Sequence, residues 1–455
     1  MLEKLKNLIK SFLIFHWINN LGYRIRKSYI YFANSRMGDQ LAYSLKHIES
    51  YDFTKKQTEA LMGILNYAQT NVPYYRKVMK KYQLNKGNIL TNLNELPFLT
   101  KSIIREQGEE IYSEHFEKEF SYWMNTGGST GEPLKFPASV NLEHIHQRCL
   151  YTLMNWKKND LIVSIDGTRI DNIMLDKKIF WKEGKANFPY GSFHYSTMYM
   201  DNSNMSHYIN HLNNVKPSIM RGYPSGIETL AKYINSNSIK LNFEFKGIYL
   251  TSEFFDSSVS ELIRKSFNCP VYGQYGHSEV SVFAFTYANS LEYLCSPLYG
   301  YTEVLDEEGN HVKVGEKGEI VVTGFSNKVM PFIRYKTGDI ATYGGNRNGV
   351  VKLSSLEGRS VDFIVNKDNK KVYLIGLIFG GHLKSFAKIN SWQIEQNKPG
   401  IITIKIVKDH GFLVEHEKEI IQLFESVGVI SVLEFVTSIP LSVRGKRKFL
   451  IQNLI

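Results

Sequence analysis

The chain has 455 residues, 43% hydrophobic and 13% aromatic, which is the composition of a folded globular protein long enough for two or three domains. These proportions exclude intrinsic disorder. A net charge of +11 suits an anionic substrate, a nucleic acid or an anionic membrane surface without choosing among them. Three widely separated cysteines, Cys149, Cys269 and Cys295, predict neither a disulfide framework nor a zinc ribbon, so a reduced, cytoplasmic setting fits best.

The first segment, residues 1–54, is expected to be basic and helical. Residues 1–30 hold six cations and one acid, with apolar side chains at helical spacing. Two interpretations stay open: peripheral contact with the inner face of the membrane, or docking of this helix on the rest of the chain. The apolar run 12–15 is too short to span a bilayer.

Residues 54–81 have a helical pattern, and a short helix over residues 101–105 is expected to be capped by Thr100. A loop rich in Gly, Ser and Thr follows at residues 125–134. Its glycines let the backbone approach an anion, and its hydroxyls and N–H groups donate hydrogen bonds, so the loop suits a polyphosphate. It is not a Walker loop, because Gly131 is followed by Glu132 and Pro133. An ordinary surface turn is the alternative interpretation.

Helices and strands alternate from about residue 141 to residue 275, which predicts an α/β domain with a largely parallel sheet. In such sheets ligand sites collect at the carboxyl ends of the strands. Pocket residues are therefore expected on segments 164–170, 193–200 and 221–225, where Asp166 and Arg169 either contact a polar substrate or form a surface pair. The expected elements are helices 141–156, 205–214 and 224–235 and strands 160–166, 219–222, 246–251 and 269–275.

Two strand ends carry polar groups. The strand ending at Thr251 is followed by Ser252 and Glu253, and the strand ending near Tyr275 is followed by Gly276, His277, Ser278 and Glu279. A carboxylate beside a phosphate loop is a natural ligand for Mg²⁺, which takes oxygen donors, so Glu279 is the magnesium candidate. The alternative for Glu279 is a charge at a helix N-terminus. His277 either donates to a carboxylate substrate or caps a turn.

The region 301–340 is rich in strands and ends in Thr-Gly-Asp339, which we expect in a tight turn. A carboxylate there suits the paired hydroxyls of a ribose, although Gly-Asp turns are common on β surfaces. Arg359 follows a glycine at a predicted domain junction. The last hundred residues predict a small α/β unit, ending in a loop with Lys446, which is able to reach a growing negative charge. A basic C-terminal tail is the alternative interpretation.

Five of these stretches occur in the order typical of the adenylate-forming (AMP-forming) ligases, over roughly residues 55–450. Within that superfamily the chain most resembles the phenylacetate-CoA ligase group, and more narrowly the CapK-type family of capsular polysaccharide biosynthesis. Three stretches carry the narrower match: 221–230 (RGYPSGIETL), 275–279 (YGHSE) and 374–379 (LIGLIF). The five stretches are Thr126–Pro133, Tyr275–Glu279, Tyr335–Asp339, Gly358–Arg359 and Gly445–Lys446.

The resemblance implies a large AMP-binding domain (55–357), with parallel sheets and a β-rich part, and a small mobile α+β C-terminal domain (358–455). It implies that ATP reacts with a carboxylate, giving an acyl-adenylate and pyrophosphate. Glu279 would hold Mg²⁺, Asp339 the ribose, Arg359 the ribose or a phosphate, and Lys446 the carboxylate and α-phosphate. Ser252, Glu253 and Tyr275 would flank the adenine, with Gly276, His277 and Ser278 beside them. The β and γ phosphates would lie on Thr126, Gly127, Gly128, Ser129, Thr130 and Gly131.

The chain departs from the family pattern at Val361, where many relatives have Asp, and in the loop 369–377, which lacks the expected Gly-x-x-Ile. The use of coenzyme A is therefore uncertain. The first interpretation is a ligase that joins a carboxylate to an amine in surface polysaccharide biosynthesis. The acid would be an amino acid, a uronic acid or a short acyl group, with a sugar nucleotide or lipid-linked glycan as partner. Alternatives are an aryl- or acyl-CoA ligase, or an inactive glycan-binding or scaffold subunit. Nucleic-acid binding is not expected, since no aromatic-basic motif is found.

Overall fold

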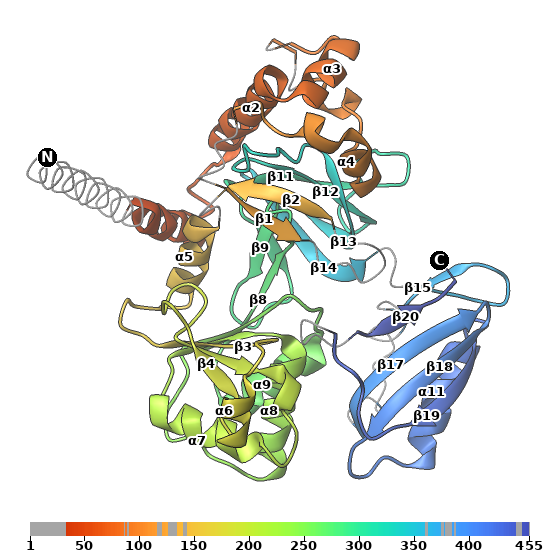
Figure 1. Ribbon diagram of the computed structural model, residues 1–455. Coiled ribbons are helices and arrows are strands. Elements are labelled where there is room, and N and C mark those ends of the chain that lie inside the picture. The colour runs from red at the N-terminus through yellow and green to blue at the C-terminus, as the bar shows by residue number, and fades with distance from the viewer. Residues whose placement is uncertain are drawn as a thin grey trace, which may run out of the picture.

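The computed structural model describes residues 33–85, 87–88, 91–115, 121–125, 134–139, 143–359, 363–374, 377, 385, 388–442 and 448–454. The segment 1–32, the expected phosphate loop at 126–133 and Lys446 lie outside these residues. Figure 1 shows three regions: an upper part with most of the N-terminal helices, a lower part where helices cover a parallel sheet, and a separate C-terminal sheet. Within the described residues, no helix is long and apolar enough to cross a bilayer.

The N-terminal region is mostly helical. The helical pattern expected over 54–81 is confirmed and forms two helices, because Val72 is extended (φ −120°, ψ 115°) and Pro73 begins the second one. A proline disfavours the helical conformation of the residue before it, which explains the break between the two helices. The cap at Thr100 is confirmed, since its side chain accepts from the N–H of Ile103 at 3.3 Å. The helices cover 33–46, α2 (Thr54–Asn71), α3 (Pro73–Lys81) and α4 (Lys101–Gln107), with 3-10 turns at Leu93–Glu95 and Gly108–Ile111.

One twelve-stranded sheet runs through the upper and lower parts, in the order β11-β12-β13-β14-β10-β9-β8-β7-β6-β3-β5-β4. The five strands from β8 to β5 are parallel to one another, and every other pairing is antiparallel. The strands are β3 (Ile162–Asp166), β4 (Trp181–Glu183), β5 (Phe193–Ser196), β6 (Ile219–Gly222), β7 (Gly247–Thr251), β8 (Val271–Gly276), β9 (Phe283–Thr286), β10 (Tyr293–Cys295), β11 (Gly300–Leu305), β12 (Lys317–Gly324), β13 (Tyr335–Arg347) and β14 (Val350–Arg359).

Both faces of the parallel strands are buried, as the expected α/β pattern requires. Along β7, Ile248 and Leu250 pack with one set of helices, while Tyr249 between them packs on the opposite face. This alternation follows from the two-residue period of a strand. One face packs against α7 (Met205–Val215), α8 (Pro224–Ser236) and α9 (Ser257–Phe267), and the other against the helix at 33–46 and α5 (His144–Leu153). A short helix, α6 (Asn172–Asp176), follows β3.

The antiparallel half of the sheet packs against α2 and α3, and the hairpin of β1 (Ser121–Asn125) and β2 (Lys135–Ser139) joins the same core. The N-terminal region is tied to β13 by backbone hydrogen bonds, because Leu99 donates to Arg334 O and accepts from Lys336 N, each at 3.0 Å. Buried Arg334 adds two bonds to backbone carbonyls, those of Asn94 (2.7 Å) and Leu96 (2.8 Å). These helices are therefore an integral part of the large sheet unit.

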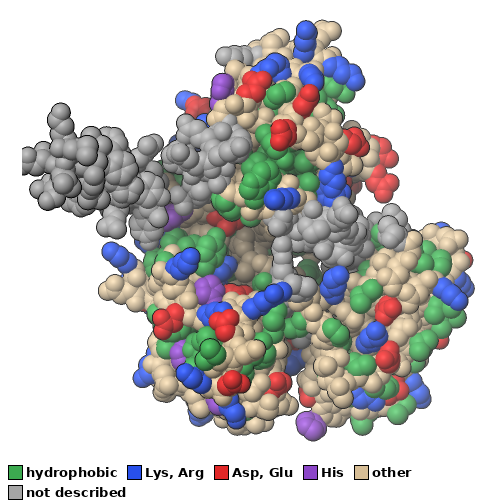
Figure 2. Space-filling view, viewed as in Figure 1, with side chains coloured by type: hydrophobic (Ala, Val, Ile, Leu, Met, Phe, Trp, Pro, Cys, Tyr) green, Lys and Arg blue, Asp and Glu red, His purple; other side chains and the backbone are tan. Residues whose placement is uncertain are grey.

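The C-terminal region forms a second sheet, in the order β19-β18-β17-β20, with its own core of isoleucines around Phe424. Lys232 of α8 donates to the carbonyl of Ile389 at 2.9 Å and so joins the two sheet units. The elements are β15 (Phe363–Val365), β16 (Lys371–Tyr373), β17 (Ile389–Lys398), β18 (Ile401–Lys408), α11 (Val414–Glu425), β19 (Ile430–Phe435) and β20 (Leu450–Gln452). On the face shown in Figure 2, acidic and basic side chains are interspersed over all parts of the surface.

Candidate nucleotide and substrate site

Two tyrosines and two carboxylates cross-link the end of β8 to the start of β13. Tyr275 of β8 donates to Asp339 Oδ2 at 2.6 Å, and Tyr335 of β13 donates to Glu279 Oε1 at 2.7 Å. Each strand thus supplies the tyrosine that orients the other segment's carboxylate. Because hydrogen bonds to a charged group are the stronger class, the reciprocal pair fixes both carboxylates. The structure brings together two acids that are 60 residues apart in sequence, Glu279 and Asp339.

Glu279 is buried, with 4% of its surface exposed, and lies in a turn rather than at a helix N-terminus. Burial alone would raise its pKa, but the charge and proximity of His277, with Nδ1 3.2 Å from Oε2, and the Tyr335 hydrogen bond lower the pKa to about 2. Glu279 is therefore ionised at neutral pH. The next residue, Val280, has a positive φ of 54°, a conformation that costs a β-branched residue on the order of 1–3 kcal/mol.

His277 lies beside Glu279 at the start of a turn, where its carbonyl accepts from Val280 N at 3.1 Å, and 13% of its side chain is exposed. Its ring also contacts Tyr335, with centroids 6.0 Å apart. Its Nε2 is buried and has no hydrogen-bond partner among the described residues. Gly276 ends β8, and a Cβ there would lie 2.9 Å from Gln274 Nε2. Ser278 occupies the turn between His277 and Glu279.

Asp339 lies inside strand β13 and not in a tight turn, which corrects the expectation from sequence. The strand is bulged there: its register with β14 shifts between Asp339 and Ala341, and Gly338 has a φ of 77°. A bulge redirects a side chain without ending the strand, which explains why a Thr-Gly-Asp stretch resembled a turn. Across the ladder the Cα of Asp339 is paired with that of Arg359 in β14, so two residues expected to bind the ribose are neighbours in the sheet.

Ser252 and Glu253 follow β7 as expected. Ser252 has a positive φ of 72°, so the chain turns sharply at the strand end. The Glu253 carboxylate accepts from the backbone N–H of Ser225 at 3.0 Å, in the first turn of α8, where a negative charge is favoured by the helix dipole. The carboxylate of Glu253 therefore supports α8, an interaction that the sequence pattern did not reveal.

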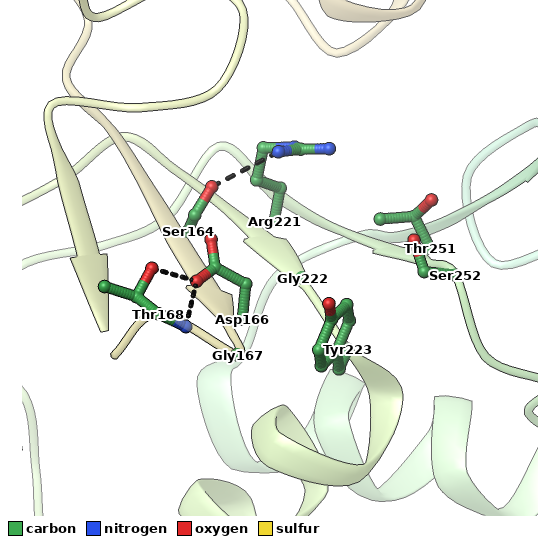
Figure 3. Close-up of a pocket in the computed structure, with 9 residues that line it drawn as sticks. All are labelled: Ser164, Asp166, Gly167, Thr168, Arg221, Gly222, Tyr223, Thr251 and Ser252. Carbon is green, nitrogen blue, oxygen red and sulfur yellow. Dashed lines mark hydrogen bonds between the residues drawn. The ribbon is translucent and has the colours of Figure 1, made fainter. Parts of the chain in front are cut away.

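A cavity of about 420 Å³ opens where β3, β6 and β7 end. We call it the strand-end cavity. Figure 3 shows Asp166 and Thr168 on one side of it, Thr251 and Ser252 on the other, and Arg221 and Tyr223 between them. Its position agrees with the segments 164–170 and 221–225 expected to line a pocket, but Arg169 is not among its lining residues. The lining residues are Ser164, Asp166, Gly167, Thr168, Arg221, Gly222, Tyr223, Thr251 and Ser252.

Three residues of the site, Arg221, His194 and Tyr335, were not assigned a role from sequence. All three stood in segments already noted, His194 within 193–200, yet nothing in the pattern marked their side chains. His194 lies on β5, and its Nδ1 is 2.8 Å from Asp166 Oδ2. The sequence did place a histidine on a strand that could pair with β3. In the parallel pairing of β3 with β5, Ser164 and His194 are direct partners.

The residues present fit a nucleotide with a bound cation. Glu279 is an ionised oxygen donor, and a magnesium ion on phosphates needs one or two protein carboxylates. Asp339 Oδ1 has no hydrogen-bond partner among the side chains that the structure describes, so this oxygen is available to a ribose hydroxyl. In the described residues no group of three or more His, Cys, Asp or Glu side chains forms a metal site of its own.

No protein-family model matches the chain. The chain is 28% identical to Protein CapK of Staphylococcus aureus over 421 residues, which are 89% of this chain and 90% of that protein. A shorter match, 28% identical over 134 residues, relates 29% of the chain to 31% of the indoleacetate–lysine synthetase of Pseudomonas savastanoi.

Each of two solved structures matches 88% of this chain, and each match spans 89% of the chain in that structure. They are 2-hydroxyisobutyryl-CoA ligase in the postadenylation state with R3-HIB-AMP, at a TM-score of 0.68 and 18% identity, and the AtGH3.15 acyl acid amido synthetase with 2,4-DB, at 0.57 and 16%. The chain is thus a homologue of Protein CapK with the fold of the adenylate-forming ligases.

Proposed function

We propose that this chain is an AMP-forming ligase that activates a carboxylate with ATP as an acyl-adenylate and transfers the acyl group to an amine. In the first step a carboxylate oxygen attacks the α-phosphorus and the bond to pyrophosphate breaks. In the second step the amine attacks the acyl carbon, an amide forms and AMP leaves. The reciprocal pairing of Tyr275 with Asp339 and of Tyr335 with Glu279 is the observation that carries this proposal.

The residues of the proposed site, among them Lys446 and residues 126–131 outside the described part of the chain, have separate roles in this reaction. Asp339 binds the ribose, and Tyr275 holds its carboxylate in place by the 2.6 Å hydrogen bond. Glu279 holds Mg²⁺, which neutralises the charge of the phosphates when it is bound. Tyr335 and His277 keep Glu279 ionised despite its burial, so that the carboxylate is ready to coordinate. Lys446 contacts the carboxylate and the α-phosphate, and residues 126–131 hold the β and γ phosphates. Residues 358–455 form the mobile C-terminal domain.

An amine acceptor is favoured by two relatives whose names describe amide formation, an indoleacetate–lysine synthetase and an acyl acid amido synthetase. The similarity to Protein CapK supports a place in surface polysaccharide biosynthesis. A sugar nucleotide or lipid-linked glycan is the acceptor in this proposal. Membrane contact is proposed for the basic residues 1–32 alone, because the helix at 33–46 packs in the core. A thioester of coenzyme A is the second candidate product, because a CoA ligase superposes at a TM-score of 0.68.

The test is pyrophosphate release from ATP and Mg²⁺ with a panel of amino acids, uronic acids, and aromatic or short acyl acids, each with and without coenzyme A. We expect release with one class of acid and its loss in Glu279→Gln. Glu261→Gln is the matched control, since Glu261 also has a pKa lowered to about 2, through hydrogen bonds from Arg264 and Lys265, but lies on α9 outside the site. If Glu279→Gln and Glu261→Gln both keep wild-type rates, the assignment of Glu279 is wrong. A product thioester would identify the CoA ligase, and a chain unable to bind ATP would be a scaffold subunit.

A further inference from the structure

The strand-end cavity carries two opposite charges on its walls. Every side chain that lines it has a polar atom, and Arg221 and Asp166 are the charged ones. The cavity ends at Ser252, a residue expected beside the adenine, so the cavity continues the nucleotide site towards β3. A volume of about 420 Å³ is enough for an acid the size of a sugar ring.

Arg221 is held rigidly at this cavity. Its guanidinium lies between the rings of Tyr190 and Tyr249, 5.1 Å from each centroid. Nε donates to the Tyr249 hydroxyl, and one Nη donates to Ser164 Oγ at 3.3 Å. Because stacking and hydrogen bonds already fix the side chain, little conformational entropy is lost when a ligand binds to it.

The charge of Arg221 has no close counter-ion. Among the described residues no carboxylate lies within 4.0 Å of it, and its second Nη has no hydrogen-bond partner there. Glu143 is the acid whose pKa the Arg221 charge lowers, but burial has the larger effect and raises that pKa. Glu143 is therefore a weak counter-ion for Arg221. Arg221 lines the cavity and is only partly buried, so an acceptor oxygen of a bound molecule would replace water as the partner of the second Nη.

Asp166 supplies the opposite chemistry. Oδ1 accepts from Thr168 N at 3.0 Å and from Thr168 Oγ1 at 2.5 Å, and Oδ2 is 2.8 Å from His194 Nδ1. Burial would raise the pKa of Asp166, but the hydrogen bonds from His194 and Thr168 outweigh burial and lower it, so Asp166 is ionised. An ionised carboxylate only accepts, so a ligand group that pairs with Asp166 must be a donor.

We propose that the acid bound in the strand-end cavity is a hydroxylated acid of the uronic type, free or as part of a glycosyl compound. A sugar hydroxyl both donates and accepts, so neighbouring hydroxyls satisfy Asp166 and Arg221 together. The ring of Tyr223 offers a flat surface to the C–H face of the sugar. An aliphatic or aromatic ring offers no hydroxyl to Asp166 or to the second Nη of Arg221. This inference rests on the proposed function and specifies its substrate.

The test compares kcat/KM for pyrophosphate release with D-glucuronate, D-galacturonate and UDP-glucuronate against cyclohexanecarboxylate, phenylacetate and L-glutamate. Cyclohexanecarboxylate matches the uronate ring but lacks its hydroxyls. We expect at least one uronate to exceed it by about 100-fold or more, because a site built to bind hydroxyls rejects an analogue without them. Equal or greater kcat/KM with cyclohexanecarboxylate, phenylacetate or glutamate would overturn the inference.

The second arm uses Asp166→Asn, with Asp171→Asn as the matched control, since Asp171 is an exposed acid paired with Lys182 away from the cavity. We expect Asp166→Asn to raise KM for the uronate by about 10-fold or more, with a smaller change in kcat and an unchanged KM for ATP. Asp171→Asn should match the wild type. An unchanged KM in Asp166→Asn would refute the role of Asp166. Failure of the proposed function is distinguishable, because the wild type would then release no pyrophosphate with any acid of the panel, whether or not the acid carries hydroxyls.

Discussion

Replacing Asp339 by Asn isolates the charge that the proposed nucleotide site presents to the ribose. The side chain keeps its shape, and Tyr275 is still able to donate to the remaining oxygen, which is now an amide oxygen instead of a carboxylate oxygen 2.6 Å away. Hydrogen bonds to a charged acceptor contribute about 1.5–3 kcal/mol. We therefore expect the Kd for ATP to rise by about 10-fold to 150-fold, since about 1.4 kcal/mol corresponds to a factor of ten.

The assay is isothermal titration of the protein with ATP and Mg²⁺ in the absence of acid, so that no adenylate forms. Tyr275→Phe is the matched control, because it removes the 2.6 Å hydrogen bond to Asp339 but keeps both the Asp339 charge and the aromatic ring. We expect Tyr275→Phe to weaken ATP binding less than Asp339→Asn does. An unchanged Kd in Asp339→Asn would show that Asp339 has only a structural role in β13. Equal losses in the two variants would place the effect in the Tyr275 hydrogen bond and not in the ribose contact.

Three further predictions follow from other parts of the chain. Lys446→Ala should abolish adenylate formation in a single-turnover assay and leave ATP affinity within a few-fold, whereas normal turnover would exclude Lys446 from the reaction. Arg334→Met should lower the free energy of unfolding by about 3–5 kcal/mol in urea, because it removes the buried partner of Glu303, 3.3 Å away in a pair that is 2% exposed, and leaves only the exposed ring of His311 at 3.6 Å; a loss below about 1 kcal/mol would contradict this. Burial lowers the pKa of His146 to about 3, so between pH 6.5 and 3 the unfolded state binds one more proton. As the pH is lowered through this range, the free energy of unfolding should fall by about 1.4 kcal/mol per pH unit, and His146→Gln should remove that contribution. Parallel stability curves of wild type and His146→Gln against pH would refute the reasoning.

The sequence predicted the parallel part of the fold well. Strand β6 was expected at 219–222 and is found there, and α8 begins at Pro224 as expected, because a short apolar run followed by Gly-Tyr-Pro marks both boundaries. The antiparallel half was harder to predict. Strand β13 continues through a Gly-containing bulge to Arg347, and local turn chemistry does not distinguish such a bulge from the end of a strand.

The candidate site shows the same division between local and long-range information. Glu279 and Asp339 were singled out because they follow short motifs, which are local patterns. The hydroxyl that orients Glu279 comes from Tyr335, 56 residues away, and no spacing rule connects the two. Likewise Asp166 was expected to act with Arg169, its neighbour in sequence, but the cation at the cavity is Arg221 on the adjacent strand. Partners across a sheet become apparent only when the register of its strands is known.

The attachment of the N-terminal helices to β13 has a consequence for synthesis of the chain. Leu96 and its partner Arg334 are 238 residues apart, and at about 5–20 residues per second a ribosome needs about 10–50 s to make that stretch. During this interval apolar side chains of α2 and α3, such as Leu65 and Met79, have no completed antiparallel sheet to cover them. The nascent chain therefore depends on chaperones or on transient helix contacts until β13 emerges, and the parallel strands, which lie earlier in the sequence, are able to assemble first.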